Sequence, residues 1–418
     1  MAAQSIRIAI IGGGLAGACM ANALFQKPNL DVHVYEASPE FSERGAAVGL
    51  AQNAINALEA IIPSARDSVL KKAGAVPTNS TRLIMASGPH AGQKVFDLPT
   101  SENNCIVHRA ALLSALIAPL PGNSLHVNKK LQSISINEGK YKVVFGDGTV
   151  ETFDAVIGAD GIFGSVRKHV LHEATAEHAA SPAGFWDCRY LVPFGKAKEK
   201  LGAQYFDVHR QYGWCGDGAF IMHDVLDHGE TVQCVISAVE ENPSEERSWP
   251  LTREILEDKL KSWLDGPIAK NMIDLILECP DLRLYHQWEH KSTPTYANGN
   301  ACIMGDAAHA MSPWQGSGAG MAIEDAAVLG ALLGQVKAPE EISVAFRAYD
   351  QVRRPRDQRV VDSSNVTGRM MCLQGAAASV DATGLLGLLG SRWDFIYKFD
   401  IHDEIRRAVS LAKDLGKK

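Results

Sequence analysis

A glycine-rich turn close to the N-terminus constrains the fold of this chain more than any other feature. The segment IRIAIIGGGLAGACMANALF, residues 6–25, places Gly12, Gly14 and Gly17 between a β-rich run and a helical pattern. The first glycine permits a tight turn, the second lets a pyrophosphate approach the backbone, and the third lets the helix pack closely on the strand. A second β-rich run at 32–35 completes a βαβ unit. The pattern predicts an α/β chain with a Rossmann-like, dinucleotide-binding domain and a parallel sheet.

The acid that ends the second β-rich run narrows the choice of nucleotide. Glu36 stands about 20 residues beyond the glycines, where a carboxylate accepts hydrogen bonds from both hydroxyls of an adenosine ribose. This position favours NAD or FAD over a nucleotide with a 2′-phosphate. The N-terminus of the first helix, around Leu15 and Ala16, offers amides and a positive dipole end to the phosphates. At this point the pattern does not separate FAD from NAD.

Composition excludes several classes of protein. The formal net charge of −7 gives no electrostatic reason to expect nucleic acid or an anionic membrane as a partner. No apolar run reaches the length of about 18 residues that a membrane span needs, and the N-terminus lacks the features of a signal peptide. The eight cysteines are scattered without a CxxC pair, which argues for a reducing compartment and against a metal site. We therefore expect a cytoplasmic protein.

The order of strand-like and helical segments predicts a discontinuous organisation. A nucleotide-binding domain is expected from 1–175 and 296–370, because the strand-then-turn style of the opening returns after residue 300. A β-rich, aromatic substrate domain is expected at 176–295, and a helical C-terminal region at 371–418. The leucines of the C-terminal region are compatible with packing on the core or with a homodimer contact.

Four further segments carry a resemblance to a known family. They are GADGIFGSVR at 158–167, GDAAHAMSPWQGSGAGMAIEDA at 305–326, CIVHRAALLSAL at 105–116 and ERGAAVGL at 43–50. Their content and order resemble the class A (single-component) FAD-dependent aromatic monooxygenases of the para-hydroxybenzoate hydroxylase fold, in the salicylate hydroxylase-like branch. The resemblance implies a Rossmann-like FAD-binding domain with an inserted β-rich substrate domain and a helical C-terminal region.

The resemblance also implies which residues hold FAD on the flavin side. Asp306 is expected to accept a hydrogen bond from a ribityl hydroxyl. A glycine-rich helix N-terminus is expected at the flavin's pyrimidine edge, where its amides stabilise negative charge. Pro313 is expected to shape the space above the flavin. The full set on this side is Arg44, Gly49, Arg109, Asp160, Asp306, Gly316, Gly318, Ala319 and Gly320.

The activity that the resemblance implies consumes NADH or NADPH and O₂. The reductant reduces FAD, and a flavin C4a-hydroperoxide then hydroxylates an aromatic or phenolic small molecule. The chain has only one strand–GxGxxG–helix unit, so the nicotinamide is expected to meet the flavin transiently. Two alternatives remain open from the residues. One is a flavin-dependent epoxidase or oxidative-rearrangement enzyme of a larger secondary metabolite, and the other is an NAD-dependent dehydrogenase.

Substrate recognition is predicted to centre on Arg189, in a segment that resembles a family strand whose arginine faces the substrate. A guanidinium fork there could hold a carboxylate or phenolate and polarise it, although an exposed strand arginine with a solvated head is an equally good reading. His209, Arg210, His223 and Trp314 are further candidate substrate residues.

Two departures from the family pattern bear on the choice of substrate. Asp224 and Val225 stand where relatives often carry a Tyr-Pro pair, and Trp314 stands where many salicylate hydroxylases carry histidine. Both differences disfavour salicylate itself and indicate a larger or less acidic ring.

Two polar groups in the second half of the chain are expected to be structural. His309 is expected to make a structural hydrogen bond. The arginines of RRPRDQR, residues 353–359, are expected to form one solvated helical face.

Overall fold

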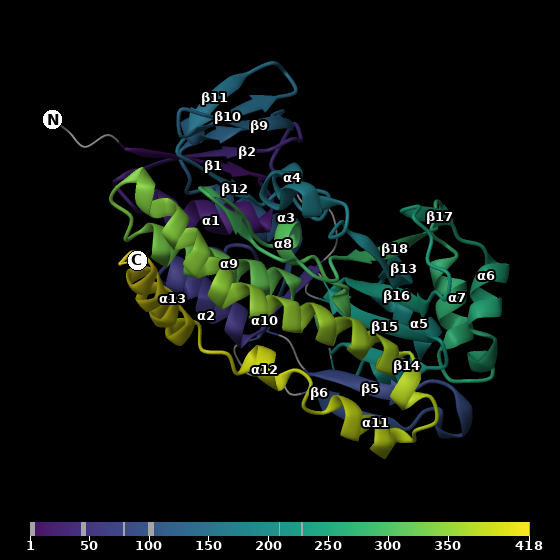
Figure 1. Cartoon of the computed structure of the whole chain (residues 1–418). Coiled ribbons are helices and arrows are strands. Elements are labelled where there is room, and N and C mark those ends of the chain that lie inside the picture. The colour runs from purple at the N-terminus through teal and green to yellow at the C-terminus, as the bar shows by residue number, and fades with distance from the viewer. Residues whose placement is uncertain are drawn as a thin grey trace.

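A computed structural model describes residues 5–42, 47–77, 80–98, 104–208, 210–226 and 229–417. Among the helices of these residues, none combines the length and the apolar character needed to cross a membrane. The described chain builds two main sheets, joined by long C-terminal helices (Figure 1).

The first sheet brings together segments from both ends of the sequence. Its strand order in the described chain is β19–β20–β12–β1–β2–β8, and every neighbouring pair except β19 and β20 is parallel. The strands are β1 Ile6–Ile11, β2 Leu30–Tyr35, β8 Leu125–His126, β12 Ala155–Gly158, β19 Ala297–Asn298 and β20 Ala301–Ile303. This is the Rossmann-like parallel sheet that the glycine-rich turn predicts.

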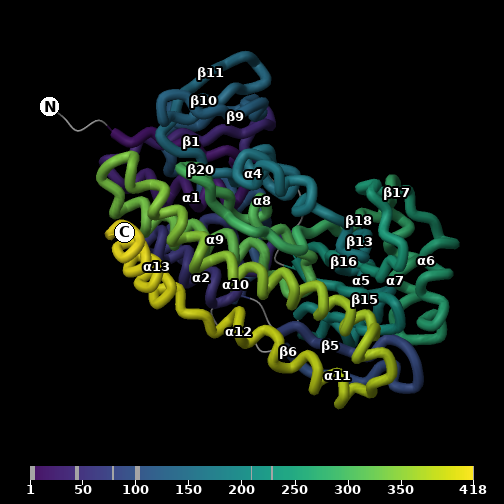
Figure 2. Tube along the Cα trace, in the orientation of Figure 1, coloured from purple at the N-terminus to yellow at the C-terminus, as the bar shows by residue number. Residues whose placement is uncertain are grey.

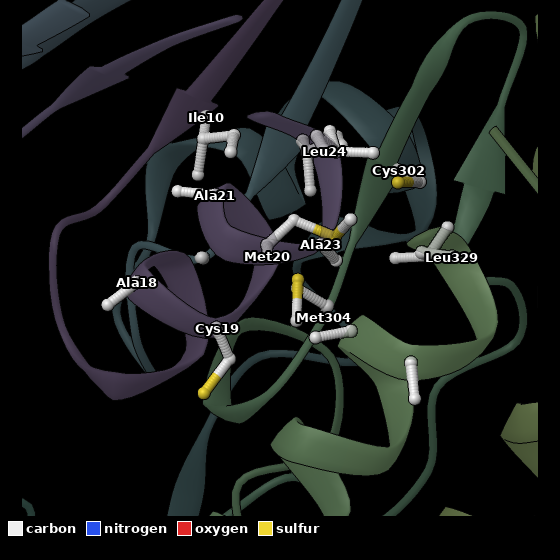
Figure 3. Packing of buried hydrophobic residues seen from close by; sticks show 14 of the residues in the cluster. Ile10, Ala18, Cys19, Met20, Ala21, Ala23, Leu24, Cys302, Met304 and Leu329 are labelled. Atoms are coloured by element: carbon white, nitrogen blue, oxygen red, sulfur yellow. The ribbon is translucent and has the colours of Figure 1, made fainter. Parts of the chain in front are cut away.

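Helices from distant parts of the sequence pack together beside this sheet. They are α1 Leu15–Phe25, α2 Gln52–Ile61, α3 Arg109–Ile117, α4 Ser165–Leu171, α8 Asp306–His309 and α9 Gly318–Leu333. Figure 3 shows Ala23 of α1 on the side of Met304 and Leu329, and Ala21 on the side of Ile10. At Gly330 of α9, an added Cβ would lie 2.6 Å from the Cβ of Ala23. The two helices therefore touch closely, which fixes the first glycine turn relative to the later one.

The second sheet has eight strands in the order β17–β18–β13–β16–β15–β14–β5–β6 within the described chain, and is antiparallel except for the β14–β5 pair. The strands are β5 Thr81–Met85, β6 Lys94–Leu98, β13 Ser181–Pro193, β14 Tyr212–Gly216, β15 Ala219–Leu226, β16 Thr231–Val239, β17 Ser248–Pro250 and β18 Arg283–Glu289. Strands β5 and β6 depart from the predicted organisation, which put 1–175 wholly in the nucleotide-binding domain. They join the substrate-side sheet because β5 pairs with β14.

One side of the second sheet packs against a hydrophobic core, and the other side is turned toward the first lobe. Helices α5 Phe194–Leu201, α6 Arg253–Lys259 and α7 Ala269–Ile276 contribute to the core on the outer face. Because successive strand residues point to opposite faces, Trp186, Cys188, Trp214 and Ile236 lie in this core. The residues between them point toward the first lobe.

Two smaller sheets and the C-terminal helices complete the fold. The small sheets contain β9 Leu131–Asn137, β10 Lys140–Phe145 and β11 Val150–Phe153, and β3 Ala47–Leu50, β4 Val76–Pro77 and β7 Cys105–His108. The remaining helices are α10 Ile342–Met371, α11 Ala382–Leu389, α12 Asp394–Tyr397 and α13 Ile401–Leu415. Figure 2 shows α10 running from the first lobe to the second, with α13 beside α2 and α9. The C-terminal leucine-rich segment thus packs on its own chain.

Candidate active site

The first glycine turn leaves no room for a side chain at its first and third glycines. Gly12 has a φ of +106°, and a Cβ there would lie 2.2 Å from the carbonyl oxygen of Ala159. A Cβ on Gly17 would lie 1.9 Å from the carbonyl oxygen of Gly12. Gly14 is the N-cap of α1 and brings no side chain to bond the first-turn amides. The turn therefore presents backbone to a ligand, as a pyrophosphate site requires.

Glu36 lies at the edge of this turn, after the end of β2. Its Oε2 accepts the backbone N–H of Gly13 at 2.8 Å, and its Oε1 accepts the N–H of Ser38 at 2.8 Å. Each carboxylate oxygen has a second lone pair, so the two bonds fix the side chain and leave acceptor capacity for ribose hydroxyls. The placement agrees with the predicted adenosine contact.

The second glycine-rich segment, residues 305–320, contacts the first glycine turn directly. An added Cβ on Gly305, whose φ is +55°, would lie 3.0 Å from the Cβ of Ala16. In the segment 305–320 the exposed residues are Asp306, Pro313 and Gly316, amid mostly buried neighbours. All three belong to the set that the family resemblance assigns to the flavin side of FAD. Exposure of an aspartate, a proline and a glycine on one otherwise buried segment fits a surface made for a cofactor.

Helix α9 begins at this second block without a side-chain cap. Ser317 is its N-cap, but the Ser317 hydroxyl donates to the carbonyl of Gln315 at 2.8 Å rather than accepting from the helix. Gly318, Ala319 and Gly320 form the first turn, and a Cβ on Gly320 would already lie 3.3 Å from that of Ala54. The residues present therefore fit FAD, with a phosphate-binding helix end at α1 and an anion-stabilising helix end at α9.

Asp160 and Arg167 connect the middle of the chain to these blocks. Asp160 Oδ2 accepts the amides of Ser165 and Val166 at 2.6 and 3.1 Å, so it caps α4. Burial raises the pKa of Asp160 to about 6 against the effect of those amides. Arg167, which is buried, donates to the carbonyls of Ala307 and Ala308 at 3.0 and 3.1 Å. Arg167 was absent from the predicted site, yet it holds the turn that follows Asp306.

Gly49 and Arg109 lie on adjoining elements. Gly49 is exposed on β3, which pairs antiparallel with β7, and half-buried Arg109 begins α3 directly after β7. Arg44 and His209 lie outside the described residues.

A cavity of about 620 Å³ separates the flavin-side segments from the second sheet. Gly49, Pro313 and Gly316 line one side, and the inward face of the sheet forms another. This size is within the range of small-molecule sites. Trp314 closes part of the wall with its ring centroid 4.8 Å from that of Phe185 and 5.7 Å from that of Phe220.

Arg189 projects from β13 into this cavity wall. Its Nη2 donates to Asp187 Oδ1 at 2.8 Å, and the Asp187 charge raises the pKa of Arg189. Gln287 Nε2 donates to the other Asp187 oxygen at 3.3 Å. The Arg189 side chain remains 50% exposed, so its fork keeps donors for a ligand.

The other predicted substrate residues fall in different places. Arg210 lines the cavity, but its Nη1 lies 3.3 Å from Asp97 Oδ1, so its charge is partly neutralised. His223 is wholly buried on the opposite face of the sheet, stacked on Tyr212 at 5.0 Å. Burial lowers its pKa to about 3, so it is neutral. The prediction of His223 as a substrate residue is therefore wrong, because strand alternation directs it into the core.

The expectation of a solvated arginine face is wrong for Arg353 and Arg356, whereas Arg359 is exposed as expected. Arg353 is wholly buried, and its guanidinium pairs with Glu324 at 2.7 Å, Asp325 at 2.9 Å and Asp357. Arg356 pairs with Glu324 at 2.7 Å. The adjacent acids in the apolar helix MAIEDAAVLGALL were the signal for buried partners, because unpaired carboxylates are not stable in such a position.

His309 belongs to the same buried network. Its Nε2 lies 2.6 Å from Asp325 Oδ2, which also accepts the amide of Gly305 at 3.0 Å. Burial alone lowers the pKa of His309, but Asp357 and Asp325 outweigh burial and raise it to about 9. Ligand atoms of the three side chains lie within 4.8 Å of one another, but Arg353 already pairs with both acids and repels a metal ion. The network instead anchors the Gly305–Asp306 turn.

This network predicts a specific pH dependence of stability. Because folding raises the pKa of His309, its contribution is complete below the ordinary value near 6.5 and is lost as the pH rises through about 9. Burial also raises the pKa of Asp357 above its ordinary value, which acts in the same direction. We expect the free energy of unfolding to fall between pH 6.5 and 9.5 by about 2–3 kcal/mol more in the wild type than in His309→Gln. Denaturant unfolding at both pH values measures this, and exposed His402→Gln is the control. Equal losses in wild type and His309→Gln would contradict the assignment.

The fold and the site together define a class A FAD-dependent monooxygenase, with one Rossmann-like cofactor site and a substrate cavity beside it. The chain belongs to the FAD binding domain family, whose profile matches residues 5–364. It is 35% identical to 6-methylsalicylate 1-monooxygenase of Aspergillus terreus, over 99% of this chain and 94% of that protein. It is 29% identical to a salicylate hydroxylase of Pseudomonas putida, over 96% of this chain and 94% of that protein. A salicylate hydroxylase solved as a substrate complex matches with a TM-score of 0.83 at 25% identity, over 97% of this chain and 98% of that one.

These similarities decide between the alternatives that the residues left open. The chain is an FAD-dependent enzyme of aromatic hydroxylation, with NADH or NADPH as reductant. Neither the dehydrogenase nor the epoxidase reading is supported by them.

Proposed function

We propose that the protein hydroxylates the ring of a small phenolic acid of the salicylate type, with Arg189 as the anchor of its anionic group. One oxygen atom of O₂ enters the ring, the other leaves as water, and NADH or NADPH supplies two electrons. The observation that carries the proposal is the cavity of about 620 Å³, which has Pro313 and Gly316 on one side and the half-exposed guanidinium of Arg189 on another. Similarity to proteins named for salicylate and 6-methylsalicylate supports this substrate class, in place of the larger or less acidic ring that Asp224 and Trp314 indicate from the sequence alone.

The residues of this chain bind and polarise the substrate in this proposal. FAD, when bound, supplies the transfer of electrons from NAD(P)H to O₂. The guanidinium of Arg189 favours the ionised form of a carboxylate or phenolate, which makes the ring more nucleophilic. Asp187 orients the guanidinium. Pro313 and the Trp314 ring shape an apolar wall and exclude water from the space above the flavin.

Replacing Arg189 with methionine tests the anchor. We expect kcat/KM for salicylate and 6-methylsalicylate to fall about a hundredfold, because about 3 kcal/mol of charge-assisted binding is lost. The flavin absorbance of the purified protein should be unchanged. The measurement is substrate-stimulated NAD(P)H oxidation with analysis of the oxygenated product.

Two further variants make the Arg189 test specific. Arg283→Met is the matched control, because Arg283 lies on β18 of the same sheet and donates to Ser248 at 3.2 Å instead of lining the cavity. The double variant Asp187→Asn with Arg189→Met removes the carboxylate charge that the single variant leaves unpaired. Full activity of Arg189→Met would refute the anchor. Stoichiometric hydrogen peroxide without an oxygenated product, across a panel of phenolic acids, would refute hydroxylation of this class.

Other features inferred from the sequence stay predictions. They are a homodimer, a cytoplasmic location and the boundaries of the three regions. The roles of the individual FAD contacts are also proposals, and the geometry around Gly12, Glu36 and Asp306 supports them.

A further inference from the structure

The cavity wall carries a second charged residue, which the proposed reaction does not use. Asp224 lies on β15, and its neighbour across β16 is Gln233. Arg189 on β13 pairs with Val235 on β16, which pairs in turn with Met222 on β15. Along the strands, these residues lie two positions from Asp224 and Gln233, on the side nearer to Trp314. Strand geometry puts the Cα atoms of Arg189 and Asp224 about 7 Å apart along the strands and about 10 Å apart across them. Side chains from these two positions can therefore contact opposite ends of one aromatic acid.

The side chain of Asp224 is held in place by a relay of polar groups. The Thr81 hydroxyl donates to Gln211 Oε1 at 3.0 Å, which turns the Gln211 amide nitrogen toward Asp224. That nitrogen donates to Asp224 Oδ2 at 3.3 Å. The relay fixes the carboxylate at the cavity wall without neutralising it.

No cation among the described residues pairs with this carboxylate. Arg210, which lines the same cavity, is engaged with Asp97, which Arg82 also holds at 2.7 Å. Asp224 is only 8% exposed, and burial raises its pKa to about 6 against the hydrogen bond from Gln211. A carboxylate has about four acceptor positions, and the hydrogen bond from Gln211 occupies only one of them. The remaining positions are suited to a donor on a ligand.

We propose that Asp224 is a specificity-determining residue, which accepts a hydrogen bond from a second hydroxyl on the substrate ring and rejects an anionic group at that place. The inference rests on the proposed function, because it takes the anionic end of the substrate to lie at Arg189. The preferred substrate class is then a phenolic acid with a further hydroxyl at the end of the ring remote from its carboxylate. A buried unpaired carboxylate penalises a second anion and discriminates strongly in favour of a donor.

Matched substrates make the test direct. The series is salicylate bearing a hydroxyl, a methoxy or a carboxylate group at C4 or at C5. We expect the wild type to prefer the hydroxyl over the methoxy compound at one position by at least about tenfold in kcat/KM, with the carboxylate compound the poorest. In Asp224→Asn, the ratio of kcat/KM between the hydroxyl and the methoxy compound should fall about tenfold through a change in KM. The kcat/KM for the carboxylate compound should rise. Asp224→Leu should abolish the preference for hydroxyl.

The control distinguishes the effect of removing the Asp224 charge from general damage to the sheet. Glu230→Gln makes the same acid-to-amide change at an exposed position just beyond β15, and it should leave the selectivity unchanged. A purely structural role of Asp224 would lower activity on all members of the series equally and would overturn the inference. The same holds if both Asp224 variants keep the wild-type selectivity.

The outcome for Asp224 is distinguishable from the outcome for the proposed function. If the wild type oxidises NAD(P)H with none of the series, the proposed function fails. Binding of the same compounds to the oxidised holoenzyme, followed by the shift of the flavin absorbance, then decides the inference. An affinity preference for hydroxyl that disappears in Asp224→Leu supports it, and the absence of such a preference overturns it.

Discussion

Replacing Arg353 with methionine is expected to lower the free energy of unfolding by about 3–5 kcal/mol. The guanidinium is wholly buried and pairs with three wholly buried carboxylates, those of Glu324, Asp325 and Asp357. Removal of the cation leaves these acids with less neutralising charge in a medium that solvates them poorly. Denaturant unfolding followed by circular dichroism measures the loss.

The neighbouring arginine is a matched control for this result. Arg354 on the same helix pairs with Asp350 at 2.8 Å, but its side chain is 34% exposed. A solvent-screened pair of this kind contributes about 0–1 kcal/mol, so Arg354→Met should be nearly neutral. Arg353→Lys keeps the positive charge but loses the planar guanidinium, so its loss in free energy of unfolding should lie between those of Arg353→Met and Arg354→Met. Similar losses for Arg353→Met and Arg354→Met would contradict the importance of burial.

Substitution of Gly17 by alanine is expected to weaken FAD binding about a hundredfold. An added Cβ would lie 1.9 Å from the carbonyl oxygen of Gly12, so α1 must move away from the turn. Overpacking against backbone costs about 3 kcal/mol, and the phosphate-binding amides move with the helix. Titration of the apoprotein with FAD, followed by flavin fluorescence, measures the change in affinity.

A glycine with free space around it provides the comparison. Gly387 lies in α11, and an added Cβ there meets nothing within 4 Å. Gly387→Ala should keep the wild-type affinity for FAD and stabilise the helix by about 0.5–1 kcal/mol. Unchanged FAD affinity in Gly17→Ala would show that the close approach of helix and turn is dispensable.

The cofactor site was predictable from the sequence because its parts are local. A strand, a glycine turn and a helix follow one another within 20 residues, and Gly12 and Gly17 are required by contacts inside that unit. Asp306 and Gly316 are recognisable because they belong to a second compact block that resembles one of the family's segments. Within the β-rich domain expected at 176–295, Thr231–Val239 forms β16, because its β-branched residues suit a strand.

The substrate side was less predictable because a strand has two faces. His223 and Asp224 are adjacent in the sequence, but one lies in the core and the other in the cavity wall. A strand pattern alone does not decide which face receives the core when both faces carry aromatic and polar residues. The choice depends on which face α5, α6 and α7 cover and which face turns toward the first lobe, and the alternation within a strand does not show this.

The sequence by itself determined a Rossmann-like dinucleotide-binding unit, since short-range geometry requires its glycines and acid at their spacing, and the resemblance of four further segments indicated FAD and the family. Only the tertiary structure decided which polar groups meet across the molecule. Arg353 finds Glu324 and Asp325 by the packing of α10 on α9, and Arg189 and Asp224 share a wall through pairing of β13, β16 and β15. Such partners are set by long-range packing, and a buried charge gives no indication in the sequence of the residue that neutralises it.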